Sequence, residues 1–278
     1  MRSIWYEMIF IFFVIICAVV GYVIYCEWPT NYMTLAILNV GNGTAVYVES
    51  PTHQRVLIDG GSNHTILGAV RTLVPFYVKT LDAVFLTGSG DGQVGGLMDI
   101  ADVYHIKKMI EGATTSTMLY KEFKKHLMQR GVSSISIRQG DTLNFNNDMN
   151  IFVSYAPVSG TTEGKVIMKL TFGSSTAILT AGEPAPFEEY VLARDGTRSR
   201  AADILTTWYN GTESIPSTAF IKAVSPRFLV VSAGSKKVLN VKAFSKVASS
   251  TLLFTVQDGP IIFHCTKEVC TLVSPTSF

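Results

Sequence analysis

Histidine is scarce in this chain of 278 residues, and so are the motifs of common hydrolases. The chain has no G-x-S-x-G nucleophile turn, no cysteine–histidine triad pattern and no P-loop lysine, which excludes the usual serine, cysteine and nucleotide hydrolases. We interpret each histidine as a surface or satisfied core residue, because they are scattered singly along the chain. They are His53, His64, His105, His126 and His264.

Charge is absent from residues 8–26, MIFIFFVIICAVVGYVIYC. As a helix this stretch would extend about 28 Å, close to the thickness of a bilayer's hydrocarbon core. It has no polar stripe, which a buried helix of a soluble protein would show. A cleaved signal peptide would end in small residues, whereas this stretch ends Tyr-Cys-Glu-Trp-Pro. The sequence therefore predicts one uncleaved transmembrane anchor.

The charges beside this anchor predict its orientation. Arg2 precedes it and Glu27 follows it, so the positive-inside tendency gives a short cytoplasmic N-terminus, residues 1–7. Residues 32–278 would then form an extracytoplasmic domain held at the cytoplasmic membrane. Four aromatic residues fit the two membrane interfaces: Trp5, Tyr6, Tyr25 and Trp28.

Cysteine is also rare, with four in the chain. Two lie in the predicted anchor, and the other two, Cys265 and Cys270, lie in IIFHCTKEVCTLV. The apolar runs on either side of TKEV predict a hairpin, in which opposed cysteines can form a disulfide in an oxidising compartment. The bonded and the reduced pair both remain open. A metal site is disfavoured, since this pair and His264 lack further ligands.

The rest of the chain alternates between strand and helix patterns, which predicts mixed sheets with helices outside, an α/β fold. No repeat or long linker divides it, so we expect one domain. Helices are predicted at residues 67–77, 118–130, 187–193 and 218–223. Strands are predicted at 34–48 with a turn at 41–43, 55–59, 83–87, 107–111, 134–138, 151–155, 165–171, 176–180, 204–207, 228–232, 247–256 and 260–264.

A glycine-rich loop follows one of these strands. Residues 85–97, FLTGSGDGQVGGL, contain five glycines and a single aspartate, Asp91. One interpretation is a structural turn from strand to helix, with residues at positive φ. The other is a nest of backbone N–H groups that binds an anion.

Residues 38–61, LNVGNGTAVYVESPTHQRVLIDGG, resemble the opening hairpin of metallo-β-lactamase-fold hydrolases, especially the type found in the competence-channel protein ComEC. That family has L-D-V-G-Q-G-D-A, then a strand that ends L-I-D-G-G. The resemblance covers residues 32–273 and implies an αββα sandwich. Later segments follow in the family's order: AVFLT, LTAGE at 179–183, ADILTTWYNGT at 202–212, FLVVSAG at 228–234 and TVQDGPIIF at 255–263, which resembles a final hairpin joined at an Asp-Gly turn.

The family's signature T-H-x-H-x-D-H-x-G-G supplies ligands to two metal ions that activate a water molecule. Without a gap it falls on residues 87–96 of this chain. Its histidine positions become Gly88, Gly90 and Gln93, its aspartate position becomes Gly92, and Asp91 stands one place early. Glycine has no ligand atom, and a neutral amide is a poor ligand here.

The family's remaining ligand positions are also changed. The aspartate of its T-G-D corresponds to Glu183, the histidine pair of its G-H-H-G-S turn to Tyr209 and Asn210, and its late histidine falls near Val241. The resemblance therefore implies a site that has lost its metal ligands, with no cofactor, no catalytic residue and no small-molecule substrate assigned. One alternative remains, a hard cation or an acid–base pair held by Asp91 and Glu183.

From this resemblance we expect a membrane-anchored, catalytically inactive domain that acts as a binding or assembly module, with DNA or a competence-channel subunit as its partner. The alternatives are an active phosphoesterase or nuclease with an atypical site, and a binding module unrelated to DNA uptake. The helix at 118–130 is basic, which also fits a solvated helix face. The residues expected to contact DNA phosphates are Lys107, Lys108, Lys121, Lys124, Lys125, Arg130, Lys236 and Lys237.

Overall fold

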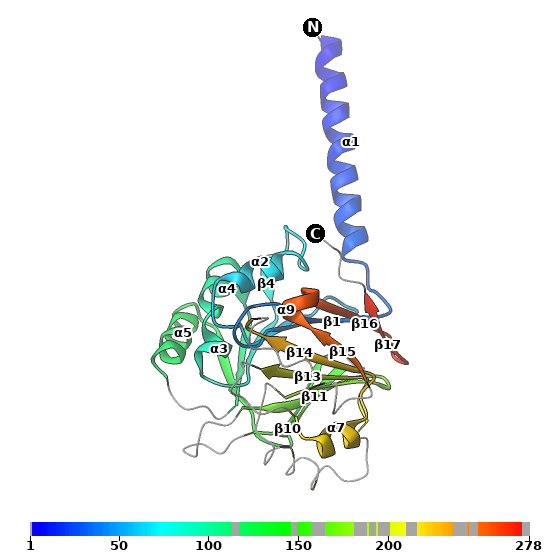
Figure 1. Cartoon of the computed structure of the whole chain (residues 1–278). Coiled ribbons are helices and arrows are strands. Elements are labelled where there is room, and N and C mark those ends of the chain that lie inside the picture. The colour runs from blue at the N-terminus through cyan, green and yellow to red at the C-terminus, as the bar shows by residue number, and fades with distance from the viewer. Residues whose placement is uncertain are drawn as a thin grey trace.

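A long apolar helix, α1 (Arg2–Cys26), leads into a body of two β-sheets (Figure 1). Within it, Trp5–Cys26 has a mean hydropathy of 2.9 and is long and apolar enough to cross a membrane. The computed structural model describes residues 2–112, 117–145, 149–156, 165–180, 188, 193, 201–209, 216–235, 244 and 250–273.

The first sheet has eight strands in the order β17-β16-β1-β2-β3-β5-β7-β8. Pairs from β17 to β3 are antiparallel, and pairs from β3 to β8 are parallel. The strands are β1 (Met33–Ile37), β2 (Val46–Glu49), β3 (Arg55–Ile58), β5 (Ala83–Leu86), β7 (Lys108–Glu111), β8 (Ser133–Ser136), β16 (Ile261–Cys265) and β17 (Cys270–Val273).

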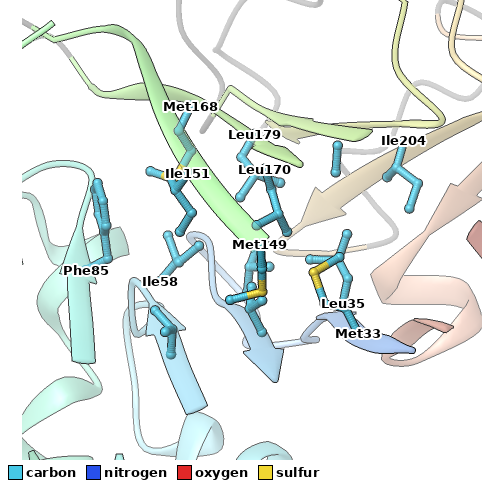
Figure 2. Close-up of a cluster of buried hydrophobic side chains, with 14 of the residues drawn as sticks. Met33, Leu35, Ile58, Phe85, Met149, Ile151, Met168, Leu170, Leu179 and Ile204 are labelled. Atoms are coloured by element: carbon cyan, nitrogen blue, oxygen red, sulfur yellow. The ribbon is translucent and has the colours of Figure 1, made fainter. Parts of the chain in front are cut away.

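The second sheet has seven strands in the order β15-β14-β13-β12-β11-β10-β9. They are β9 (Thr142–Phe145), β10 (Met149–Tyr155), β11 (Ile167–Phe172), β12 (Ser175–Leu179), β13 (Ile204–Tyr209), β14 (Phe228–Ala233) and β15 (Thr251–Phe254). A small parallel pair joins β4 (Thr80–Leu81) to β6 (His105–Ile106). The sheets face each other across a core of alternating apolar side chains, among them Leu35, Ile58, Phe85, Ile151 and Leu170 (Figure 2).

Helices cover the outer faces of both sheets. A second apolar cluster joins the outer face of the first sheet to α2 (Thr65–Arg71), α3 (Asp91–Val94), α4 (Leu97–Val103) and α5 (Met118–Gln129). A third cluster joins the second sheet to α7 (Thr218–Val224), with α9 (Thr255–Asp258) beside it. The expected αββα arrangement with helices outside is therefore confirmed.

Some predicted elements differ from the structure. The helix expected at 67–77 begins at Thr65 and ends at Arg71, because Pro75 lacks an N–H and disfavours a helical residue before it. The strand expected at 247–256 is shorter, and TVQD forms α9 instead. The expected hairpin at its Asp-Gly turn is wrong, since β15 pairs in the second sheet and β16 in the first. The helix expected at 187–193 lies largely outside the described residues.

Two local predictions agree closely with the structure. The basic helix α5 begins after Thr117, whose hydroxyl accepts the Tyr120 N–H, and it is followed by Gly131 at φ 75°. Cys265 and Cys270 lie opposite each other in the β16–β17 hairpin and are joined by a disulfide.

Candidate functional site

The glycine-rich loop connects the end of β5 to α3 and α4, at the edge where metallo-β-lactamase-fold enzymes hold their metals. It packs against the β1–β2 connection: the Thr44 N–H donates to the Gly92 carbonyl at 3.0 Å. It also packs against the segment after β3, where the Gly60 N–H donates to the Gln93 carbonyl at 2.6 Å. The loop is therefore held by backbone contacts from two neighbouring connections.

Close packing, and not positive φ, explains the glycines of this loop. Gly90, Gly95 and Gly96 have φ values of −74°, −51° and −90°, so the expectation of positive φ is wrong for them. A Cβ at Gly96 would lie 2.4 Å from a methyl of Ile66 and 2.5 Å from two backbone oxygens. A Cβ at Gly92 would lie 3.2 Å from the Cα of Gly43. The left-handed glycines lie in the partner segments, at Gly41, Gly43 and Gly61.

A buried carboxylate, Asp59, supports the loop from below. It follows β3 and accepts three hydrogen bonds: from the Thr87 N–H at 2.9 Å, the Thr87 hydroxyl at 2.5 Å and the Thr44 hydroxyl at 2.7 Å. Burial raises the pKa of Asp59 to about 6, although these hydrogen bonds and the positive charge of Lys165 oppose the shift. Asp59 therefore joins the ends of β3 and β5 to the β1–β2 connection.

A lysine–tryptophan pair covers the loop from the second sheet. The Lys165 ammonium lies 4.5 Å from the centroid of the Trp208 ring, within cation–π range. A Cβ at Gly88 would lie 3.5 Å from the Cγ of Lys165, and a Cβ at Gly92 would lie 3.9 Å from the edge of Trp208. Lys165 is placed by its neighbour Val166, whose N–H donates to the Thr87 carbonyl at 2.9 Å. Two of the expected metal-ligand positions thus lie beneath this pair.

Two buried donors at this edge have no hydrogen-bond partner among the described residues. They are the amide nitrogen of Gln93 and the indole nitrogen of Trp208. Buried donors are normally paired, and an unpaired one costs about 1–3 kcal/mol. With the Lys165 ammonium above them, the edge holds three donor groups, one of them charged.

The residues of this edge that the structure describes do not fit a two-metal centre. Gly88, Gly90 and Gly92 have no ligand atoms, and Asp91 is exposed in the first turn of α3. Tyr209 lies at the end of β13 with its ring against Phe244. Within the described ranges no group of three histidine, cysteine or acidic side chains could hold a metal ion. The other expected positions, Glu183, Asn210 and Val241, lie outside the described residues.

The basic residues expected to contact DNA fall into two groups. Three of them have acidic partners: Lys107 with Asp82 at 2.7 Å, Lys124 with Glu111 at 2.6 Å, and Arg130 with Asp102 at 3.2 Å. For Lys108, Lys121 and Lys125, all exposed, the described part of the chain offers no carboxylate partner. Lys236 and Lys237 lie outside the described residues.

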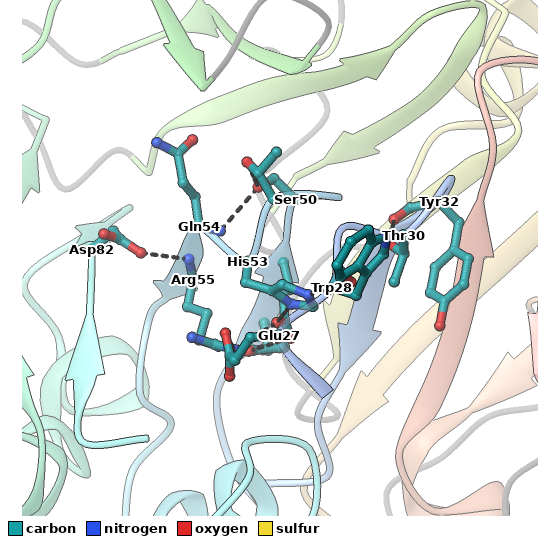
Figure 3. Close-up of polar contacts among 12 residues, drawn as sticks. Glu27, Trp28, Thr30, Tyr32, Ser50, His53, Gln54, Arg55 and Asp82 are labelled. Carbon is teal, nitrogen blue, oxygen red and sulfur yellow. Dashed lines mark hydrogen bonds and ion pairs between the residues drawn. The ribbon is translucent and has the colours of Figure 1, made fainter. Parts of the chain in front are cut away.

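A polar network joins the foot of α1 to the body (Figure 3). The buried Arg55 guanidinium lies 3.2 Å from carboxylate oxygens of both Glu27 and Glu49. His53 contacts Glu49 through Nδ1 at 2.7 Å and the Trp28 carbonyl through Nε2 at 3.1 Å. This histidine is therefore part of a structural junction, far in sequence from the glycine-rich loop.

Comparison with solved structures defines the class of protein. The chain is similar to the metallo-β-lactamase-fold protein YhfI from Bacillus subtilis, with 18% identity and a TM-score of 0.58 over 82% of this chain and 98% of that one. It is similar to the metallo hydrolase Igni18 from Ignicoccus hospitalis, with 14% identity and a TM-score of 0.56 over 83% and 98%. For zinc-bound PqqB from Methylobacterium extorquens the identity is 11% and the TM-score 0.55, over 80% and 97%.

These similarities establish the fold: the chain has the metallo-β-lactamase fold, preceded by one helix apolar enough to span a membrane. No protein-family model matches the sequence, and neither does any curated protein.

Sequence reasoning missed the residues that cover and support the loop. Asp59 stood in the quoted LIDGG motif but was not assigned a role. Lys165 and Trp208 gave no local signal, because they are far apart in the sequence: Lys165 lies just before β11, and Trp208 lies in β13.

Proposed function

We propose that this chain is a membrane-anchored protein of the metallo-β-lactamase fold that binds a partner and does not carry out metal-dependent hydrolysis. The helix α1 is its membrane anchor, and the body lies on the extracytoplasmic side of the cytoplasmic membrane. The positive-inside tendency of the residues around α1 supports this orientation.

One observation carries the proposal: the loop that would bear metal ligands is covered by Lys165 and Trp208. A Cβ at Gly88 would lie 3.5 Å from Lys165 and one at Gly92 would lie 3.9 Å from Trp208, so a longer side chain such as histidine or aspartate would extend toward these two residues. A fixed ammonium also repels a divalent cation, which in this fold would need anionic or imidazole ligands. Compared with a metal-binding edge of this fold, this edge therefore differs in charge as well as in its side chains.

The partner we propose is anionic, and DNA during uptake is the first example to test, followed by a subunit of a competence channel. The positive charge of Lys165, which lies over the Trp208 ring, favours an anionic group such as a phosphate near this edge. Exposed Lys108, Lys121 and Lys125 add positive charge on a neighbouring face. Backbone phosphates would be contacted without sequence preference.

The test is a pair of measurements on the full chain in nanodiscs. Metal content is measured after incubation with zinc, manganese and magnesium, and cleavage is measured on labelled DNA. We expect no stoichiometric metal and no cleavage. Near-stoichiometric metal together with cleavage that is lost in Asp91→Ala would refute the proposal and establish the atypical phosphoesterase instead.

Binding is tested by fluorescence anisotropy with labelled single- and double-stranded DNA at increasing salt. We expect affinity to fall steeply with salt, and the Lys108→Gln, Lys121→Gln, Lys125→Gln triple variant to bind all sequences more weakly. The matched control is Lys107→Gln, at a lysine already paired with Asp82. Affinity that is independent of salt, or unchanged in the triple variant, would count against DNA and leave a protein subunit as the partner.

A further inference from the structure

The turn between α2 and β4 presents an apolar side chain to solvent. Its sequence, residues 72–79, is TLVPFYVK. Val74 is buried and fixes one side of the turn to the core, and the Val78 N–H donates to the Pro75 carbonyl at 2.9 Å. At the tip, Phe76 is 83% exposed. Its ring meets the Tyr77 ring edge-on, with the ring centroids 5.5 Å apart, so two aromatic side chains lie together in this turn.

This turn lies at the foot of the anchor helix. Thr72, Leu73 and Pro75 line a cavity of about 320 Å³ together with Cys26, the last residue of α1. Burial and the Glu27 carboxylate raise the pKa of Tyr77, in the same turn, to about 12. Figure 1 shows the turn, in cyan, on the side of the body from which α1 leaves.

The composition around the turn matches a membrane interface. Residues 60–81 contain no acidic residue, and exposed Arg71 and Lys79 stand on either side of the tip. At the end of α1, Tyr25 and Trp28 are 79% and 69% exposed, as expected for aromatic residues at an interface. Basic side chains near a bilayer surface attract anionic headgroups.

We propose that the turn at residues 72–79 is a second membrane contact, in which Phe76 enters the headgroup–acyl boundary and Arg71 and Lys79 contact lipid phosphates. The contact rests on the proposed anchoring by α1. It would stop the body from rotating freely about the helix and hold one face of it against the bilayer.

The test uses the full chain in nanodiscs of phosphatidylcholine, with or without phosphatidylglycerol. A solvent-sensitive nitrobenzoxadiazole label is attached at Phe76→Cys in a Cys17→Ser, Cys26→Ser background, and quenching by lipids with brominated tails is measured. The control label is at Met128→Cys, an apolar residue of α5 that is 63% exposed and lies away from the turn. We expect blue-shifted emission and strong quenching at position 76, and neither at position 128.

A third label tests the anchor itself. It is placed on the native Cys17 of a Cys26→Ser chain, within the apolar helix. Quenching at Cys17 but not at position 76 would overturn the second contact and leave the anchor standing. No quenching at Cys17 would refute the anchor and the second contact together.

The basic residues are tested in the same system. Arg71→Gln with Lys79→Gln is expected to weaken quenching at position 76 in nanodiscs that contain phosphatidylglycerol. In phosphatidylcholine alone the double variant should have little effect on quenching, because these headgroups carry no net negative charge for Arg71 and Lys79 to attract. An equal loss in both lipids would contradict the electrostatic part of the contact.

Discussion

The ammonium of Lys165 lies over the ring of Trp208, and both side chains lie on the glycine-rich loop at the Gly88 and Gly92 positions. Asp59, on the other side of the same loop, is held by Thr87 and Thr44. The loop is therefore packed from both sides. This packing lies at the positions that the resemblance aligns with metal ligands, which is the observation behind the proposed absence of a metal site.

Removal of Trp208 should strongly destabilise the body. We expect Trp208→Ala to lower the free energy of unfolding by about 3–5 kcal/mol, since a buried aromatic ring is lost and a cavity is left. Lys165→Met keeps the aliphatic chain and removes the charge, so its cost should be smaller, about 0.5–2 kcal/mol. Denaturant unfolding in detergent compares the two. An equal cost for both variants would show that the ring does not contribute through packing.

Two glycines of the loop should differ sharply in their tolerance of a methyl group. Gly88→Ala should change stability by less than about 1 kcal/mol, because its Cβ would make ordinary contacts, with Lys165 Cγ nearest at 3.5 Å. Gly96→Ala should cost about 1–3 kcal/mol or more, since its Cβ would overlap Ile66 and two backbone oxygens. Thermal unfolding of the two variants measures the difference. Similar melting temperatures would contradict the close packing.

The stability of the body should fall as the pH rises from about 4 to about 6. Burial raises the pKa of Asp59 to about 6, above its unfolded value of about 4, so the folded state binds more protons across this window. The contribution is about 3 kcal/mol, fully present below the unfolded pKa and lost above the folded one. Denaturant unfolding at a series of pH values measures how the free energy of unfolding changes with pH.

Asp59→Asn is the control for this titration, because its amide keeps the shape and can still bond to Thr87 and Thr44. We expect the variant to lose the Asp59 part of the slope. Burial also raises the pKa of Glu188 to about 7, although the Ser217 N–H opposes the shift. Glu188→Gln should therefore remove a separate part of the slope, which extends to higher pH. A slope unchanged in Asp59→Asn would assign the whole effect to other groups.

Substitutions of Lys124 and Lys125, which are adjacent in α5, should affect stability differently, because only Lys124 pairs with a buried carboxylate. Lys124 donates to Glu111, a buried carboxylate that also accepts from Ser134 at 2.6 Å and from Tyr120. Burial of Glu111 opposes ionisation, but these hydrogen bonds lower its pKa below the ordinary value. Lys124→Ala should therefore cost about 1–3 kcal/mol of stability. Lys125→Ala, on the exposed face, should leave the stability unchanged. Chemical unfolding of the two variants measures the difference.

Part of this architecture was predictable because its signals are local. The apolar run of α1, the capped helix α5 and the opposed cysteines of the last hairpin each depend on neighbouring residues. Two predictions from the sequence were wrong. The helix α2 ends earlier than predicted, before Pro75. The chain between β15 and β16 forms the short helix α9 instead of a hairpin turn. In each case one residue or turn outweighed an apolar pattern that continued through it.

The sequence by itself determined the apolar helix, the alternation of strands and helices, and the identity of residues that cannot bind a metal, such as Gly88, Gly90 and Gly92. The tertiary structure decided what lies against these glycines: Lys165, just before β11, and Trp208, in β13, reach the loop from distant parts of the chain. It also decided that Lys124 faces Glu111 and that Thr72, Leu73 and Pro75 line a cavity with Cys26 at the end of α1. Composition and periodicity describe neighbours along the chain, whereas these contacts depend on how distant segments pack.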